Sequence, residues 1–497
     1  MTRGATTPSP RSDREQAAAL GTEPVGRLLW RSCAQTTVSV SVYGLYAVTN
    51  AWFVAWGVGP VALAAVNTVA PVLLALGAVA ATVGAGAASL VSRSLGAGDP
   101  AQAARAAGTA FVVFWTTAAV GGVAGVALVD PLLTLLGATG ELRGYARDYA
   151  VVILGGAITG TGFSSLVRAE GRLRFSTMMW VWALATQIVL DPVLIFGFGL
   201  GVRGAAWGTV AGQAVSTAMS LWFFFGPRQH RRPYRIGLTD LRPHGPTLRR
   251  LVAVGSPSFL AGVGATLLAA LTNNLLVAAG GAVALSAGAL CARVGTLVAM
   301  PQLGIAQGLQ PVAGFNSGSG AVDRVRRATT LTVRATVGYG VVAGLVLLVA
   351  ADPLAGLFTS EPVVRGQAAT ALRIVALGCP SAGLVPLLSA RFQALGQPLP
   401  SYLLSIGTVL VVKIPLLVAG GSVGVTALWI SVPVAELVSA GAALLVLRRW
   451  PWPAGCDGGS TGTRSARRRP VTRARASGES ASGPIVHGAG RPSRPGR

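Results

Sequence analysis

Twelve apolar segments occupy most of this 497-residue chain. Each has the roughly 20 residues that a helix needs to cross the hydrocarbon core of a bilayer. Lipid offers no water to open backbone groups, so we expect these segments to be helices rather than strands. The sequence therefore predicts an all-α integral membrane protein with twelve transmembrane helices. The segments are 28–56, 61–92, 107–130, 148–168, 175–200, 203–226, 250–279, 283–315, 327–351, 367–391, 399–420 and 423–447.

The second half of the chain repeats features of the first. The motif SLGAGDP around Gly96 is matched, 222 residues later, by NSGSGAV around Gly318. The tripeptide Asp-Pro-Leu at 130–132 recurs at 352–354, at the same offset. Duplication in a hydrophobic chain is typical of secondary transporters, whose substrate site lies between related halves. Because the copies run in the same order, we expect two six-helix lobes of the same membrane orientation.

The sequence divides into five parts. Polar residues 1–26 lack the apolar core and cleavage site of a signal peptide, so we expect a disordered cytoplasmic tail. The other parts are an N-lobe over 27–226, a basic cytoplasmic linker over 227–249, a C-lobe over 250–447 and a disordered basic cytoplasmic tail over 448–497.

The distribution of arginine among the loops predicts the orientation of the chain in the membrane. Loops after the even-numbered spans carry most of the loop arginines, so the positive-inside rule places both termini in the cytoplasm of a bacterial cell, with the spans in the plasma membrane. These arginines include Arg93, Arg105, Arg172, Arg174, Arg228, Arg231, Arg232, Arg235, Arg242, Arg324, Arg326 and Arg327.

The basic surplus does not indicate a nucleic-acid partner. The net charge is +24, but only 11% of residues are charged, and no basic stripe carries interleaved stacking aromatics. We expect membrane lipids and a small-molecule substrate as partners, and a monomer.

Motifs for enzymatic or metal chemistry are missing from the sequence. The four cysteines lie far apart without CxxC spacing, and the three histidines lie in loops or the tail. Lys413 is the single lysine, so a GxxxxGK[ST] phosphate loop is excluded. We expect no enzyme activity, metal or cofactor, with H⁺ or Na⁺ as coupling ion.

Asp191 in the fifth span is the strongest candidate for chemistry, because an ionisable group inside a span is costly. Pro192 follows it and bends the helix. Burial disfavours the charged form of a carboxyl, so Asp191 could bind a proton, or a monovalent cation together with freed carbonyls. Gln187, one turn earlier, and Thr209, in the next span, could complete the site. Alternatively, Asp191 caps the helix near the extracellular interface, and the other two are ordinary interhelical hydrogen-bonding residues.

Other polar residues inside spans are cavity candidates. Asn50 in the first span is an amide that can donate and accept but cannot titrate, and alone it suggests helix packing. Tyr43 and Tyr46 near it could line a cavity, or could be lipid-facing anchors. Asn273 and Asn274 in the seventh span could line the cavity or join helices.

Lys413 and Glu436 are interior by position in spans eleven and twelve. They could form a buried ion pair that is structural or acts as a gate, or Glu436 could be a second proton carrier. We expect Arg293 in span eight to pair with backbone carbonyls or a carboxylate.

Four motifs resemble the multidrug and toxic compound extrusion (MATE) family, most closely its prokaryotic DinF-like branch. They are LVSRSLGAGDPAQAARAAG, RAEGRLRFSTMM, LDPVLIFGFGLGVRGAAWGTV and MPQLGIAQGLQPVAGFNSGSG. The resemblance covers residues 27–447. It implies two six-helix lobes that form a V, and export of organic cations and other amphiphiles in exchange for protons or sodium.

The resemblance also implies site residues. Asp191 takes the position of the family's span-five aspartate, Gln187 that of an asparagine, and Thr209 that of a threonine. Asn50 stands where the branch has a span-one aspartate, so this chain departs from the pattern there.

We therefore expect a secondary active antiporter that exports small amphiphilic or cationic compounds by alternating access. Two alternatives are a lipid-linked precursor flippase, which would favour a larger cationic cavity, and a non-transporting membrane receptor or scaffold that has lost coupling.

Overall fold

The computed structural model describes residues 13–160, 163–227, 232–242 and 244–450, and within these ranges the chain is helical and contains no strand. Most of the predicted C-terminal tail, and the linker residues Arg228 and Arg231, lie outside the described ranges. The helices of the first half are α2 (Val25–Gly57), α3 (Pro60–Gly96), α4 (Pro100–Ala127), α5 (Val129–Leu135), α6 (Gly140–Gly155), α7 (Phe163–Ala169), α8 (Leu173–Pro192) and α9 (Gly201–Phe225). The 3₁₀ turn η1 (Ala157–Thr159) and the π-helix η2 (Val193–Gly197) complete this half.

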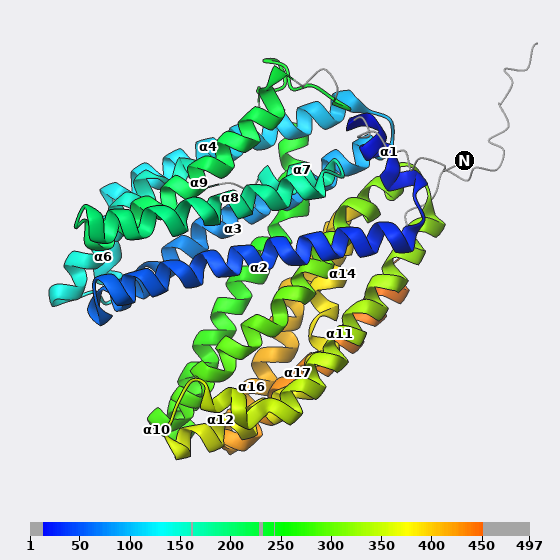
Figure 1. Ribbon diagram of the computed structural model, residues 1–497. Helices are drawn as coiled ribbons and strands as arrows, with labels where there is room; N and C mark the ends of the chain where they lie inside the picture. The colour runs from blue at the N-terminus through cyan, green and yellow to red at the C-terminus, as the bar shows by residue number, and fades with distance from the viewer. Residues whose placement is uncertain (1–12, 161–162, 228–231, 243, 451–497) are drawn as a thin grey trace, which may run out of the picture. The chain divides into compact units, whose positions relative to one another are not determined.

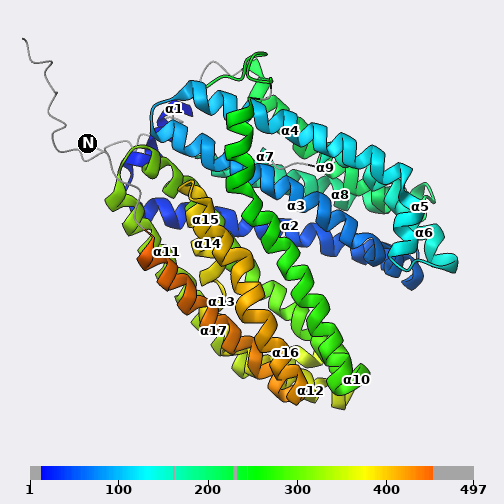
Figure 2. The same ribbon diagram turned by 180° about the vertical axis from the view of Figure 1, so that it is seen from behind.

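The second half begins with α10, and Figures 1 and 2 show that it crosses α3 before it reaches the other helices of its half. This half contains α10 (Gly245–Gly318), α11 (Val322–Gly356), α12 (Pro362–Ala376), α13 (Cys379–Ala382), α14 (Leu384–Ala394), α15 (Pro398–Tyr402), α16 (Ile414–Val423) and α17 (Val425–Arg449). Two π-helices, η4 (Leu403–Gly407) and η5 (Val409–Lys413), lie between α15 and α16.

The described helices confirm a multi-pass membrane architecture. Eight are long and apolar enough to cross a membrane, and ten spans result if each of two bent pairs is one span. The bends are 50° between α6 and the helix ending at Ala169, and 55° between α12 and the helix ending at Ala394. The 74-residue α10 is itself broken at Gly281, where φ is 64°. A positive φ is accessible to glycine, which explains why the chain turns there. The count of twelve spans stays a prediction.

The expectation of a disordered tail over residues 1–26 is wrong for its second half. Residues Asp13–Thr22 form helix α1, and Val25 already begins α2. Ala17 and Leu20 are buried, with exposures of 5% and 2%. These two residues are three apart and share one helix face, so burial against the rest of the protein orders a segment whose composition alone is polar.

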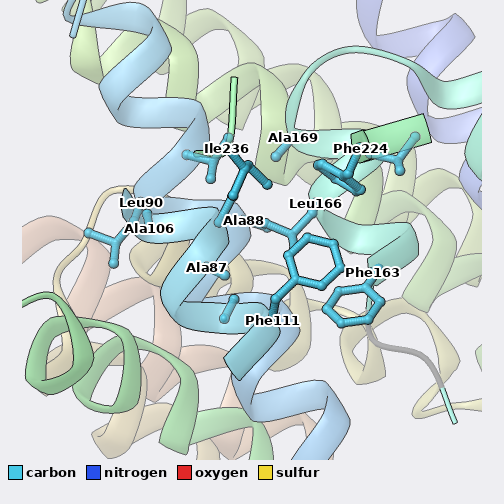
Figure 3. Packing of buried hydrophobic residues seen from close by; sticks show 14 of the residues in the cluster. Ala87, Ala88, Leu90, Ala106, Phe111, Phe163, Leu166, Ala169, Phe224 and Ile236 are labelled. Carbon is cyan, nitrogen blue, oxygen red and sulfur yellow. The ribbon is translucent and has the colours of Figure 1, made fainter. Parts of the chain in front are cut away.

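The first half has an aromatic core at the end where α4, α7 and α9 meet. The ring of Phe111 stacks on Phe163 with centroids 4.0 Å apart, and Phe224 meets Phe111 edge-on at 5.1 Å. Figure 3 shows these rings grouped with Leu166 and Ile236. Ile236 comes from the predicted linker, so part of that segment belongs to this core.

Residues 232–242 are anchored rather than free. Arg232 is 3% exposed and forms an ion pair with Glu170, which is 2% exposed. The Arg232 guanidinium also lies 4.3 Å from the ring centroid of Phe223 and 4.4 Å from that of Phe224. Burial raises the pKa of Glu170, and the charge of Arg232 opposes this shift. The basic linker is therefore fixed to the first half through a buried ion pair.

Candidate functional site

Asp191 is fully buried near the end of α8, with an exposed fraction of 0%. Pro192 and the π-helix η2 follow it directly. Within the part of the chain that the structure describes, both carboxylate oxygens lack a hydrogen bond of normal geometry, as do both amide atoms of Gln187, which is also 0% exposed. Gln187 lies one turn earlier and is close enough to interact with the carboxylate. A buried polar group without a partner is costly, and such groups concentrate where a ligand or ion binds.

Glycines of α9 make room for this carboxylate. A Cβ atom on Gly208 would collide with Asp191 Oδ1, so the carboxylate lies directly against the α9 backbone. Four residues to either side, a Cβ atom on Gly204 would lie 2.9 Å from the carbonyl carbon of Leu194, and one on Gly212 would lie 2.7 Å from the oxygen of Ala183. Glycines at this spacing share one helix face and let two helices approach closely.

Thr209, the residue after Gly208, belongs to a cluster of hydrogen-bonded polar residues. The side-chain amide of Asn50 donates to Thr209 Oγ1 at 3.0 Å and to the carbonyl oxygen of Ala205 at 3.2 Å. The hydroxyl of Tyr46 donates to the carbonyl oxygen of Thr209 at 2.5 Å, and that of Tyr149 to Asn50 Oδ1 at 3.4 Å. Asn50 is 5% exposed and Thr209 is 6% exposed. This network joins α2, α6 and α9 one residue after the glycine of α9 that Asp191 lies against.

The same polar cluster forms part of the wall of a cavity of about 530 Å³. This volume falls in the range of small-molecule sites. The ring of Trp180 meets that of Tyr43 edge-on at 4.9 Å on this wall. Among the described residues that line the cavity, none is Asp, Glu, Lys, Arg or His. The polar residues of the lining include Tyr43, Tyr46, Asn50, Tyr149, Thr209 and Gln213.

The structure places the predicted cavity residues in two different regions. Tyr43 and Tyr46 line the cavity, as the cavity alternative for these aromatics requires. Asn273 and Asn274 do not line it: both are exposed on α10. Their assignment to a substrate cavity stays a prediction. Polarity within a span does not reveal which way a side chain faces, and consecutive helical residues point in different directions.

Lys413 and Glu436 form the predicted ion pair in the second half. Lys413 Nζ lies 2.5 Å from Glu436 Oε1, and each side chain is 19% exposed. Lys413 is the last residue of η5, and Glu436 lies three residues after Pro433 in α17. Glu436 Oε2 has no hydrogen-bond partner among the described residues. Arg293 is exposed on α10 and is not part of this pair, and its expected pairing with backbone carbonyls or a carboxylate stays a prediction.

Two functional residues were missed in the sequence. Gly208 could have been found, because Gly204, Gly208 and Gly212 recur every four residues, a spacing typical of close helix packing. Tyr149 carries no such signal, since a tyrosine near the start of an apolar segment is common at membrane interfaces.

Comparison with known proteins decides the family. The MatE family model matches residues 36–193 and 257–419, which together are more than half of the chain. The chain belongs to the MatE family. The two matched blocks fall in the two halves that the duplication defines, and the assignment as a MATE family transporter is confirmed, while the DinF-like branch stays a prediction.

Relatives of this MATE protein are transporters. It is 24% identical over 427 residues to the FAD transporter of Shewanella oneidensis, an alignment that covers 84% of this chain and 92% of the relative. It is 26% identical over 418 residues to the multidrug export protein MepA of Staphylococcus saprophyticus, covering 81% and 89%. These relatives therefore support assignment of this protein to the membrane transporters rather than to the enzymes.

Solved structures confirm the fold of this MATE protein. A crystal structure of a MATE protein in complex with MaL6 is similar with a TM-score of 0.82 and 25% identity, covering 87% of this chain and 97% of that one. A MOP superfamily transporter from Pyrococcus furiosus, described as having a binding pocket of reverse polarity, is similar with a TM-score of 0.81 and 26% identity, covering 87% and 97%.

Proposed function

We propose that this protein exports small amphiphilic or cationic compounds across the plasma membrane in exchange for H⁺ or Na⁺, by alternating access. The observation that carries the proposal is Asp191, a carboxylate with 0% exposure and no hydrogen-bond partner of normal geometry among the described residues, beside a cavity of about 530 Å³. A group of this kind gains stability when it binds a proton or a monovalent cation, because either neutralises a buried charge.

The contacts around Asp191 couple cation binding at the carboxylate to the shape of the cavity. The carboxylate lies against Gly208, and the next residue, Thr209, is held by Asn50 and Tyr46 in the cavity wall. Cation binding moves the carboxylate relative to α9 and thereby changes the shape of this wall. If the substrate binds more tightly to the cavity in the cation-free state, cation binding weakens substrate binding and substrate binding weakens cation binding. This mutual weakening gives an exchange cycle.

The aromatic wall fits the substrate class. Tyr43, Trp180 and Tyr46 offer flat apolar surface with hydroxyl and indole groups at its edge, which suits planar amphiphiles. Of the two relatives named above, one is a multidrug export protein and the other is an FAD transporter. A transport panel should therefore contain an organic cation, an uncharged planar compound and a flavin.

Liposomes that contain the purified protein test the coupling. Efflux of a fluorescent organic cation is measured with a proton gradient, a sodium gradient or neither. We expect one gradient to drive efflux, and Asp191→Asn to abolish this dependence while the protein stays folded. Asp130→Asn is the matched control, because Asp130 is 53% exposed on α5. Full gradient-driven export by Asp191→Asn would refute the assignment.

Neither alternative function has comparable support. A flippase for an anionic lipid-linked precursor would favour a cationic cavity, whereas Arg293 is exposed and Lys413 is paired with Glu436. A receptor or scaffold would show no gradient-dependent efflux in the same liposomes. On the basis of the arginine-rich loops, we further propose that both termini lie in the cytoplasm. We also propose that the protein acts as a monomer.

A further inference from the structure

Helix α1 contacts the first half of the protein at the loop between α7 and α8. A Cβ atom on Gly171 would lie 3.1 Å from the carbonyl oxygen of Gln16 and 3.4 Å from the side chain of Leu20. The guanidinium of Arg172 donates to Gln16 Oε1 at 3.0 Å. Leu20 is only 2% exposed, so α1 is packed in place rather than resting on the surface.

The end of the same helix contacts the second half. The side-chain amide of Asn316, at the end of α10, donates to the carbonyl oxygen of Leu20 at 2.9 Å. Arg324, at the start of α11, donates to the carbonyl oxygen of Glu23 at 2.7 Å and to that of Leu20 at 3.3 Å. Arg324 also donates to Asn316 Oδ1 at 2.7 Å.

These contacts satisfy the last carbonyl groups of α1, which have no partner within the helix. The positive charge of Arg324 also complements the negative end of the helix dipole. A Cβ atom on Gly21 would lie 2.8 Å from the ring of Phe315, so the backbone of α1 approaches α10 as closely as a glycine allows. The second half thus binds α1 through hydrogen bonds to its last carbonyl groups and through the apolar cluster that contains Leu20. The first half binds it through the Arg172–Gln16 hydrogen bond and the close approach at Gly171.

We propose that α1 is a latch that joins the two halves at the predicted cytoplasmic end and must detach from one of them before the site opens to that side. This inference rests on the alternating access of the proposed function. The two sets of contacts lie in series along one short helix, so the halves cannot separate at this end while both sets persist. Figures 1 and 2 show α1 at the end where the helices of the two halves come together.

A native cysteine reports whether this end opens. Cys33 in α2 lies against the second half, since its thiol donates to the carbonyl oxygen of Ile305 at 3.7 Å. A Cβ atom on Gly308 would lie 2.8 Å from the Cα atom of Cys33, so the two helices are in close contact there. Separation of the halves would expose this thiol to water. The other three cysteines can be replaced by alanine, leaving Cys33 as the single reactive group.

The test is the rate at which a water-soluble maleimide modifies Cys33 in the purified protein. We expect Arg172→Ala and Arg324→Ala each to raise this rate at least about fivefold, the effect of losing one or more hydrogen bonds from the closed state. Because detaching either end releases the latch, the two routes to the open state add, and the rate increase of the double variant should be about the sum of the two single increases. Gln16→Ala should act like Arg172→Ala. Arg327→Ala is the matched control, an exposed arginine on the same helix as Arg324, and should leave the rate unchanged.

Unchanged rates in both single variants would overturn the latch. So would a double variant whose rate increase is the product of the two single increases, because independent contacts behave in that way. Thermal unfolding of each variant identifies a rate increase that reflects general loss of structure, and such an increase would also count against the latch. The readout needs neither substrate nor gradient, so it can fail or succeed independently of the proposed transport.

Discussion

Gly96 in α3 and Gly318 in α10 each lie against the backbone of the other's helix. A Cβ atom on Gly96 would collide with the carbonyl oxygen of Phe315, and one on Gly318 would collide with the carbonyl oxygen of Arg93. Gly318 lies 222 residues after Gly96, and Phe315 lies 222 residues after Arg93, so the two contacts use equivalent positions of the two copies. The contact is therefore reciprocal, like an isologous interface between two identical subunits. The duplicated glycines hold the two halves together at the end that carries the arginine-rich loops.

This reciprocity predicts that Gly96→Ala destabilises the protein by about 1–3 kcal/mol, the usual effect of forcing an extra methyl group into a packed contact. The collision is with backbone, which cannot rotate away. Gly77→Ala on the same helix is the matched control, because a Cβ atom there meets nothing within 4 Å. It should be neutral or slightly stabilising, since alanine favours a helix. Thermal unfolding in detergent measures both variants, and equal effects would refute the contact.

Gly208→Ala should impair coupled export while leaving the fold intact. The added methyl group would occupy the place of Asp191 Oδ1 and displace the carboxylate from the α9 backbone. We expect at least about a tenfold loss of gradient-driven efflux, because a small displacement in a preorganised site is costly. Gly262→Ala, in open space on α10, should retain normal efflux. Normal transport by Gly208→Ala would show that the position of Asp191 against α9 is unimportant.

Asn50→Asp should be tolerated and should change the pH or sodium dependence of transport. The hydroxyl groups of Thr209 and Tyr149 beside Asn50 can donate to a carboxylate, while the carbonyl oxygen of Ala205, which accepts from the Asn50 amide, favours a proton or cation on it. Two carboxylates in one site resist simultaneous ionisation, which alters how readily the site takes up a cation. The measurement is efflux as a function of pH and of sodium concentration. If neither profile moved, Asn50 and Asp191 would belong to separate sites.

Neutralising one member of the Lys413–Glu436 pair should be more damaging than neutralising both. Either Lys413→Met or Glu436→Gln leaves its partner charged in a mostly buried position, at a cost of about 3–5 kcal/mol. The double variant should regain much of this stability. Additive losses in thermal unfolding would contradict an energetic coupling between the two residues.

Transport by the double variant then separates the two roles of the pair. Recovery of both stability and efflux would assign it a structural role. Recovery of stability without efflux would assign it to a gate or to a second proton site. The same liposome assay that tests Asp191 supplies this measurement.

The sequence alone determined those properties that depend on composition along the chain. Apolar length is enough to predict membrane helices, because lipid leaves the backbone no alternative. The 222-residue repeat is enough to predict two related halves. Asp191 was identified because a carboxylate within an apolar span is rare and costly. Such residues face the interior of the helix bundle rather than lipid, and Asp191 is indeed completely buried.

Only the tertiary structure decided what depends on the direction of side chains and on contacts between distant residues. Asn273 and Asn274 are as polar as Asn50, yet both are exposed, whereas Asn50 is buried and lines the cavity. Residues 13–22 are polar on average, but burial of Ala17 and Leu20 orders them as α1. Glu436 pairs with Lys413 rather than with Arg293, another cation of the C-lobe spans, because helix packing decides which of the two cations lies within reach. Periodicity and charge constrain single helices, whereas the rotation of each helix and its partners are fixed by packing between them.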